Sequence, residues 1–368
     1  MRSTVPFNFL FFLCLLTLPA CQTASATIDI SLKSTSTPFT PVSSSVTLTP
    51  TPLLSNGSTP DPTTQSTPDT MRFSLPTPGA QPVTAWRPPL YPVPRAASPF
   101  DHFYFTRPIA VDQKNWSSPD YRYGGIFFKP GAVHTGIDIP AELGTPVLAA
   151  GPGEVVWASW GLYSSDPTNK NDPYGLAVVI QHDFGYNDQT LFTVYAHLDQ
   201  VNVVPGQWLQ TGDQLGELGQ TGFTTGPHLH FEVRLGADTY FNTRNPELWL
   251  VQPQGWGVLA ARITDSYGYV LTDLDVTLLS EETKMEWTSR TYPALGVSGD
   301  EYYQENLVMS DLPSGYYTIS FQYLQKTHEI KVQILDGQVT YFAFRGLNGF
   351  GSTPPPTEKI FFFFTPTP

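Results

Sequence analysis

Cysteine is almost absent from this chain of 368 residues. Only two occur, Cys14 and Cys21, and both lie within the first 21 positions. The rest of the chain therefore folds without a disulfide bond, and its stability has to come from buried apolar surface. The length and the 40% of hydrophobic residues suffice for two ordinary domains with their own cores.

Positive charge is also scarce. The chain has 19 lysine and arginine residues against 32 aspartate and glutamate residues, a formal net charge of −13. Proteins that bind nucleic acids by neutralising phosphates need clustered basic residues, so this balance argues against a nucleic-acid partner. Long helical periodicity is missing as well between Phe100 and Trp249, where short apolar runs alternate with turn residues. This pattern predicts an all-β fold.

The first 21 residues have the features of an export signal. Arg2 precedes an apolar run over residues 7–18 that is too short to span a bilayer. The run ends in Leu18-Pro19-Ala20-Cys21, which resembles a bacterial lipobox, the site at which cysteine is lipidated. We expect a protein of the bacterial cell envelope, outside the cytoplasm, that contacts a membrane only through a lipid anchor at Cys21. Plain secretion is the alternative.

Residues 22–99 are rich in threonine, proline and serine. Such a composition buries too little apolar surface to offset the entropy of ordering, so we expect a disordered linker. Proline favours extended geometry, which would make this linker a tether between the anchor and a folded part.

Two histidines, His228 and His230, begin an alternation of polar and apolar residues that predicts a strand. Successive side chains of a strand point to opposite faces, so both imidazoles face the same way. Two converging imidazoles suit a metal site, although exposed histidines on an edge strand fit the same pattern. Gly222 and Gly226 would allow tight turns of the backbone before the strand.

Further candidate ligands lie earlier in the chain. His134 and Asp138 are four residues apart, and Gly136 and Pro140 favour a turn into a short strand over a helix. Histidine and aspartate are both established zinc ligands. Three short motifs then occur in one order: His134-x-x-x-Asp138, Tyr195-Ala196-His197-Leu198 and His228-Leu229-His230.

These motifs resemble those of the lysostaphin-type (LytM-like) zinc metallopeptidases, which cleave cross-links or stem peptides in bacterial cell walls. The resemblance covers roughly residues 123–234. It implies a compact antiparallel, barrel-sandwich-like sheet, a Zn²⁺ ion held by His134, Asp138 and His230, and two catalytic histidines, His228 and His197. Three protein ligands would leave a fourth position for water, whose pKa zinc lowers to about 7.

The resemblance also implies roles for the neighbouring side chains. One imidazole, His228 by preference, would take the proton of the attacking water, and His197 would help to stabilise the oxyanion. An upstream tyrosine such as Tyr123 is a candidate for assisting there. Glu232 follows His230 on the same strand face, where a role behind the ligand and a surface charge are equally compatible with the sequence.

The expected function is therefore that of a zinc metalloendopeptidase, a monomer that hydrolyses peptide bonds in peptidoglycan. A catalytically silent cell-wall-binding or amidase-activating lipoprotein on the same fold is the alternative. A biotinyl or lipoyl carrier would need an exposed lysine at a hairpin tip, and residues 192–235 contain none. The polar loop 161–173 is expected at the rim of the site, and His102 and His182 are expected to be ordinary loop histidines.

A second group of short strands follows the first. The segment 311–317, Asp-Leu-Pro-Ser-Gly-Tyr-Tyr, resembles a turn of the carboxypeptidase-regulatory-like (transthyretin-like) β-sandwich. Asp336-Gly337 predicts a hairpin between the last two strands. We therefore expect a peptidase domain over residues 100–252, a smaller transthyretin-like sandwich over 256–348, and a low-complexity tail over 349–368.

Overall fold

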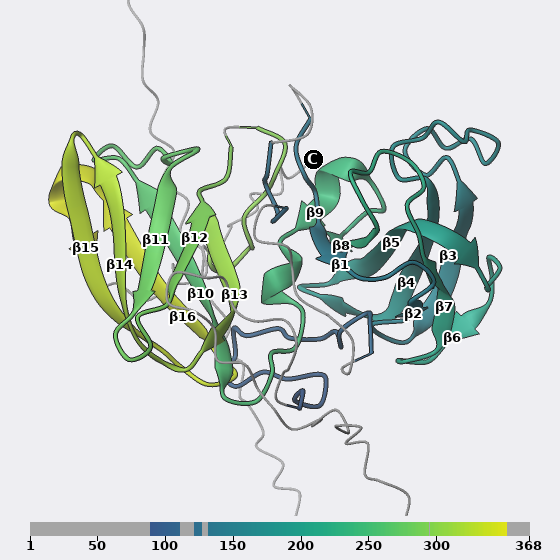
Figure 1. The fold of residues 1–368 in the computed structure, drawn as a ribbon, viewed down its shortest axis with the longest axis horizontal. Helices are drawn as coiled ribbons and strands as arrows, with labels where there is room; N and C mark the ends of the chain where they lie inside the picture. Colours follow the sequence, from purple (N-terminus) through teal and green to yellow (C-terminus); the bar gives the residue numbers. More distant parts are fainter. Residues whose placement is uncertain (1–88, 111–120, 127–131, 294, 352–368) are drawn as a thin grey trace, which may run out of the picture. The chain divides into compact units, whose positions relative to one another are not determined.

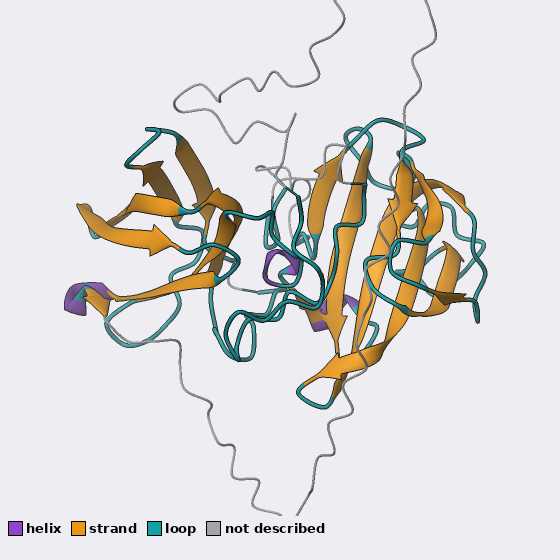
Figure 2. Ribbon diagram, turned by 90° about the horizontal axis from the view of Figure 1, so that it is seen from below, coloured by secondary structure: helices purple, strands orange, loops and turns teal. Residues whose placement is uncertain are grey.

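The computed structural model describes residues 89–110, 121–126, 132–293 and 295–351, all within one compact unit, 68–368. The expected export signal, most of the expected linker and the end of the tail lie outside the described residues. The described chain consists of β-strands joined by loops and three short 3₁₀ turns, which confirms the all-β expectation (Figure 1 and Figure 2). Within these residues, no helix is long and apolar enough to cross a membrane.

The first sheet has nine strands, and all of its pairs are antiparallel. Its path runs β1-β8-β5-β4-β3-β6, with β7 between β2 and β5 and with β9 on β8. The strands are β1 (Ile137–Pro140), β2 (Pro146–Leu148), β3 (Gly153–Trp160), β4 (Leu176–Tyr186), β5 (Gln189–Val201), β6 (Trp208–Leu209), β7 (Gln214–Leu218), β8 (His228–Leu235) and β9 (Thr243–Arg244). A compact antiparallel sheet is what the family resemblance of the motifs implied.

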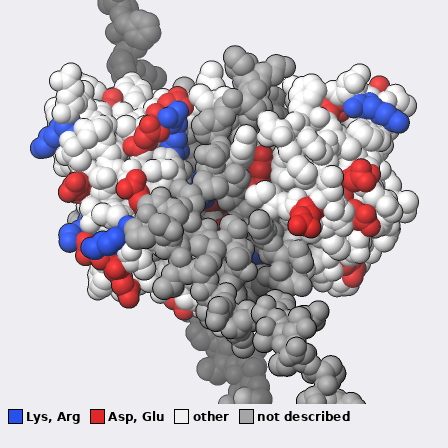
Figure 3. Space-filling model, viewed as in Figure 1, with Lys and Arg blue, Asp and Glu red and all other residues white. Residues whose placement is uncertain are grey.

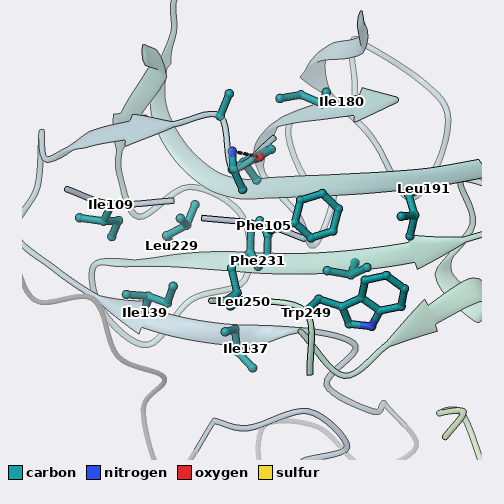
Figure 4. Packing of buried hydrophobic residues seen from close by; sticks show 14 of the residues in the cluster. Phe105, Ile109, Ile137, Ile139, Ile180, Leu191, Leu229, Phe231, Trp249 and Leu250 are labelled. Atoms are coloured by element: carbon teal, nitrogen blue, oxygen red, sulfur yellow. Dashed lines mark hydrogen bonds between the residues drawn. The ribbon is translucent and has the colours of Figure 1, made fainter. Parts of the chain in front are cut away.

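One face of this sheet packs into the main core. Leu229 and Phe231 of β8 alternate into it, as do Ile137 and Ile139 of β1, and all four side chains are fully buried (Figure 4). Full burial of each such side chain contributes roughly 1.5–3 kcal/mol. The opposite face of β1 and β8 is thereby left to their polar residues, which form the site.

Two segments before β1 contain no regular strand, although residues 103–109 and 121–128 are rich in the aromatic side chains that favour strands. Phe105 and Ile109 form only isolated bridges, with Leu250 and Val147. Pro108 has no N–H to donate to a ladder, which explains why the pairing does not continue. The described part of the second segment, 121–126, forms turns, and residues 127–128 lie outside the described part.

The folded part begins before Phe100, the expected end of the linker. Leu90 bridges Pro253, and Arg95 bridges Phe103. Residues 89–99 therefore join the fold, because their main-chain groups find partners there that the composition of the linker does not reveal.

Two four-stranded sheets follow. One is ordered β13-β10-β16-β17 and the other β12-β11-β14-β15. Their strands are β10 (Trp256–Thr264), β11 (Asp275–Ser280), β12 (Glu286–Arg290), β13 (Leu307–Pro313), β14 (Gly315–Tyr323), β15 (Lys326–Ile334), β16 (Val339–Arg345) and β17 (Phe350–Gly351). Ile263 and Phe344 of the first sheet share one buried cluster with Leu278 and Trp287 of the second, so the sheets pack face to face.

Three details differ from expectation. Asp336-Gly337 connects β15 to β16, which belong to different sheets, so the predicted hairpin is wrong. Strand β16 instead pairs with β10, in parallel. Strand β13 was not predicted, although its residues are almost all buried.

His102 and His182, expected in loops, are both buried. His182 lies in β4 between Phe105 and Phe184; its Nδ1 is 2.9 Å from the Pro152 carbonyl oxygen and its Nε2 is 2.9 Å from Thr193 Oγ1. Burial lowers the pKa of His182 from 6.5 to about 4, so the imidazole is neutral in the folded protein.

Because of this low pKa of His182, the free energy of unfolding should depend on pH. Below pH 6.5 the unfolded chain binds a proton at His182, whereas the folded chain does not. The low pKa in the folded state therefore costs no stability above pH 6.5, and the free energy of unfolding decreases as pH falls toward 4. At pH 5 the loss is about 2 kcal/mol. Urea unfolding at pH 7.5 and pH 5 should show a drop that is smaller by this amount in His182→Gln than in the wild type. Equal drops in the two proteins would contradict the assignment.

Candidate metal centre

Three potential metal ligands meet on the polar face of β1 and β8. Asp138 on β1 is paired directly across from His230 on β8, and His134 lies just before β1. Asp138 Oδ1 is 2.9 Å from His134 Nε2 and 3.0 Å from His230 Nδ1. All three are buried, and their ligand atoms lie within 4.8 Å of one another, a group that could hold a metal ion.

Hydrogen bonds on the far side of each ring fix which nitrogen faces this point. His134 Nδ1 is 3.1 Å from the carbonyl oxygen of Arg122, and His230 Nε2 is 3.0 Å from Glu232 Oε1. Both acceptors require a proton on the outward nitrogen, so the inward lone pairs of His134 Nε2 and His230 Nδ1 face each other at 3.0 Å. Lone pairs this close repel unless a proton or a cation lies between them. The donor set of two imidazoles and a carboxylate therefore fits a Zn²⁺ ion.

The electrostatics of the cluster also favour positive charge. Burial raises the pKa of Asp138, but the charges and hydrogen bonds of His134 and His230 hold it well below its ordinary value. Burial lowers the pKa of His230, yet its hydrogen bonds to Asp138 and Glu232 raise it to about 9. An ionised carboxylate and a strongly basic imidazole are the properties of a site that stabilises a cation.

Two more histidines adjoin the three ligands. His228 shares the face of β8 with His230, and its Nε2 is 3.4 Å from Asp138 Oδ2. The ring of His197, on β5, has its centroid 4.7 Å from that of His228 and 5.7 Å from that of His230. The structure thus brings together all five residues that the sequence motifs singled out.

The outer nitrogens of these two histidines bond to main-chain carbonyls. His228 Nδ1 is 2.8 Å from the oxygen of Gly226, and His197 Nδ1 is 2.8 Å from that of Thr221. Burial, with the nearby charges of His230 and His228, lowers the pKa of His197 to about 3, and burial lowers that of His228. Both rings are therefore neutral near pH 7, and each Nε2 keeps its lone pair free to accept a proton.

The backbone at His197 is locally irregular. Its φ of 64° lies in the left-handed region, which costs a non-glycine residue of order 1 kcal/mol or more. The β5–β8 ladder extends to Ala196 opposite His230, and the β5–β7 register shifts directly after Leu198. Such a bulge redirects a side chain relative to regular alternation, which gives His197 its position beside β8.

Glu232 lies behind His230 and is completely buried, so it is not a surface charge. It accepts hydrogen bonds from Tyr174 Oη at 2.8 Å and from Arg234 Nε at 2.7 Å, and another from Thr135 Oγ1. Burial raises the pKa of Glu232, but the charge of Arg234 and the hydrogen bonds from His230 and Thr135 lower it to about 2. The ionised carboxylate holds the outward N–H of His230 in place.

Tyr123, the upstream tyrosine expected near the oxyanion, has its hydroxyl elsewhere. Its Oη donates to the carbonyl of Thr243 at 3.0 Å and accepts from the N–H of Ser298 at 3.1 Å, and the residue is 3% exposed. The hydroxyl is thus engaged in the protein interior, and an oxyanion role for Tyr123 is not compatible with these contacts.

The loop 161–173 is anchored at its end beside the site. Asp172 is fully buried and accepts hydrogen bonds from the N–H groups of Ser164 and Tyr174. Tyr174 also packs against His230, and its carbonyl accepts from the His197 N–H. Gly222, with a φ of +80°, packs tightly on this loop, as its predicted turn requires, whereas Gly226 has no comparable need for glycine.

Removal of the Tyr174 hydroxyl tests the network behind His230. The hydroxyl donates to Glu232 and accepts from Arg234 Nη2 at 2.9 Å, so Tyr174→Phe leaves two buried charged groups each with one partner fewer. We expect a loss of about 1–3 kcal/mol in the unfolding free energy of the metal-free protein, measured in urea. Tyr163→Phe, at an exposed position of the same loop, is the control and should change stability by less than about 0.5 kcal/mol. Equal stability of the two variants would contradict the role of the network.

Comparison with known proteins shows which family the sequence around this site matches. Residues 132–243 match the model of peptidase family M23. The chain is 40% identical over 103 residues to the peptidoglycan DD-endopeptidase ShyA of Vibrio cholerae serotype O1, which is 28% of this chain and 20% of that protein. It is 38% identical over 110 residues to a lipoprotein NlpD/LppB homolog of Pseudomonas aeruginosa, 30% of this chain and 32% of that protein.

Among solved structures, the catalytic domain of lysostaphin from Staphylococcus simulans is 28% identical, with a TM-score of 0.29, over 34% of this chain and 86% of that one. The chain thus spans a third or less of the two curated relatives, and its similarity to them concerns one domain. The matched range contains the five clustered residues and strands β1 to β8. The chain therefore contains, at residues 132–243, a domain of peptidase family M23.

Proposed function

We propose that the chain is a zinc-dependent endopeptidase that hydrolyses peptide bonds in bacterial peptidoglycan. The observation that carries this proposal is the arrangement of inward nitrogens: His134 Nε2 and His230 Nδ1 converge on Asp138, and two neutral histidines adjoin them. The relative named as a peptidoglycan DD-endopeptidase supports the substrate class. The bond that is cleaved, in cross-links or in stem peptides, is left open.

His134, Asp138 and His230 would hold the ion. When bound, zinc supplies Lewis acidity toward water and toward the scissile carbonyl. Glu232 keeps the His230 ring in the orientation that turns Nδ1 inward. All three ligand side chains are buried, so bulk water has little access to them.

His228 and His197 would move the proton. His228 Nε2, whose partner nitrogen donates to Gly226, accepts a proton from the attacking water. The resulting imidazolium lies close to the carboxylate of Asp138, which stabilises its positive charge. The same proton is then returned to the leaving amine as the C–N bond breaks. His197 is neutral before the reaction and its ring contacts that of His228, so it is a second group that could accept a proton.

A catalytically silent relative on the same fold would show a defect in this set of residues. All five side chains are present and clustered, and each histidine has its outward nitrogen hydrogen-bonded. This observation favours the enzyme over the silent cell-wall-binding or amidase-activating lipoprotein.

Substitution of individual histidines separates binding of the ion from catalysis. His228→Ala should retain one zinc per chain but reduce the release of peptides from purified peptidoglycan by at least ~100-fold, because it removes the base and no ligand. His134→Ala should lose the zinc as well. His328→Ala, on β15 outside the M23 domain, is the control and should retain both properties. Metal analysis and mass spectrometry of the released fragments provide the two readouts. An active His228→Ala enzyme, or a wild type that binds zinc without cutting, would overturn the proposal.

The loop 161–173 is proposed to contact the substrate at the rim of the site. Tyr163 on this loop packs edge-on against Tyr240, with ring centroids 5.8 Å apart, and both side chains are accessible to a bound peptide. Deletion of residues 166–170 spares the buried Asp172 anchor. We expect a several-fold rise in KM for peptidoglycan fragments at unchanged zinc content, measured by steady-state kinetics. Unchanged cleavage would contradict this placement.

The setting of the enzyme is also a proposal. Lipidation at Cys21 would hold it in the cell envelope, and residues from 22 to about 88 would act as the tether. The relative named as a lipoprotein is in keeping with this location.

On the face drawn in Figure 3, acidic and basic side chains of the described residues are scattered among uncharged ones. We propose a peptidase domain that ends near residue 252 and a sandwich that begins near 256.

A further inference from the structure

Residues 121–125, here called the support strip, contact two of the three candidate ligands. The strip contains no regular strand, yet it makes four hydrogen bonds to them. These are Gly124 N to His134 O at 2.8 Å, His134 N to Gly125 O at 2.7 Å, His134 Nδ1 to Arg122 O at 3.1 Å, and Asp138 N to Tyr121 O at 3.2 Å. The strip therefore sets both the position of His134 and the nitrogen that it turns inward.

The segment 292–298 lies between β12 and β13, and its described residues, 292–293 and 295–298, pack against the other side of the strip. The rings of Tyr123 and Tyr292 meet edge to face with centroids 5.3 Å apart, and Tyr123 Oη bonds to the main chain of Ser298. A Cβ added to Gly124 would lie only 3.1 Å from Tyr292 Cδ1. The contact is therefore close at Tyr123 and Gly124 of the strip.

The same segment also reaches the residue next to the ligand. Val133 immediately precedes His134, and a Cβ added to Gly296 would lie 2.8 Å from Val133 Cγ2. Arg122 is held from the sandwich side as well, because its partner Glu247, fully buried, accepts a hydrogen bond from Ser310 Oγ on β13 at 2.7 Å.

We propose that the segment 292–298 positions the support strip and thereby determines how tightly His134 binds zinc. The C-terminal sheets then contribute to the metal site without supplying a ligand. This inference rests on the proposed zinc site. Its physical basis is that the strip forms no β-ladder with the nine-stranded sheet. Single hydrogen bonds join Tyr121 to Asp138 of β1 and Tyr123 to Thr243 of β9, and the packed segment supplies a further restraint. Residues that orient a ligand affect metal affinity although they do not touch the ion.

A matched pair of glycine substitutions tests the proposal from the C-terminal side. Gly296 has a φ of +95° and Gly268 a φ of +92°, so alanine introduces similar backbone strain at both. Only at Gly296 does the new Cβ meet a neighbour, Val133, because nothing lies within 4 Å at Gly268. In the full-length chain, Gly296→Ala should weaken Zn²⁺ binding about tenfold in a chelator competition. Gly268→Ala should bind Zn²⁺ as the wild type does.

A second pair of variants tests the same proposal by a change in the support strip. Tyr123→Phe removes the hydroxyl that joins the strip to Ser298, whereas Tyr303→Phe removes a buried hydroxyl that bonds to Asp101 Oδ1 at 3.0 Å, away from the strip. Each variant loses the buried hydrogen bonds of one tyrosine hydroxyl, to main-chain groups for Tyr123 and to a carboxylate for Tyr303. Thermal unfolding of the metal-free proteins measures the resulting loss of stability separately from the affinity for Zn²⁺. Only Tyr123→Phe should lower the affinity for Zn²⁺.

The outcomes separate this inference from the function on which it rests. A wild type that binds no Zn²⁺ overturns the proposed zinc site. A wild type that binds one Zn²⁺, with equal affinities within each pair of variants, overturns the positioning role alone. Weaker binding by Gly296→Ala and Tyr123→Phe than by their controls supports it.

Discussion

Alternation of side chains along β8 is the constraint on which both the core and the candidate site depend. His228, His230 and Glu232 occupy one face of this strand, and Leu229 and Phe231 occupy the other, deep in the core. A shift of the strand by one residue would exchange the two faces, so burial of the apolar residues fixes the position of the polar ones. The hydrophobic effect, which has no directional preference of its own, thereby determines where the imidazoles point.

The alternation is readable in the sequence, and for this reason the sequence alone predicts that His228 and His230 lie on one face. Their partners required more than spacing. Asp138 is 92 residues from His230 in the chain, and only the pairing of β1 with β8 makes them neighbours. The order of the three motifs, through the family that they resemble, supplied this information.

Other parts of the site left no signal of this kind. Tyr123 lay in a promising position in the sequence, but its hydroxyl bonds to Thr243 and Ser298, residues 120 and 175 positions away. The burial of Glu232 depends on Tyr174 and Arg234 as partners, and a charged residue on a strand is equally common at a surface. A turn does form at Asp336-Gly337, but the predicted hairpin does not, because a turn does not specify which strand its neighbours will join.

The acceptors that orient the histidines have a consequence for how such a site changes over generations. For His134, His197 and His228 the acceptor is a main-chain oxygen, of Arg122, Thr221 and Gly226. No single amino-acid replacement deletes a carbonyl, so these three hydrogen bonds do not depend directly on which side chain the acceptor residue carries. Insertions and deletions in the connecting segments, which alter the path of the backbone, are the changes that would disorganise them.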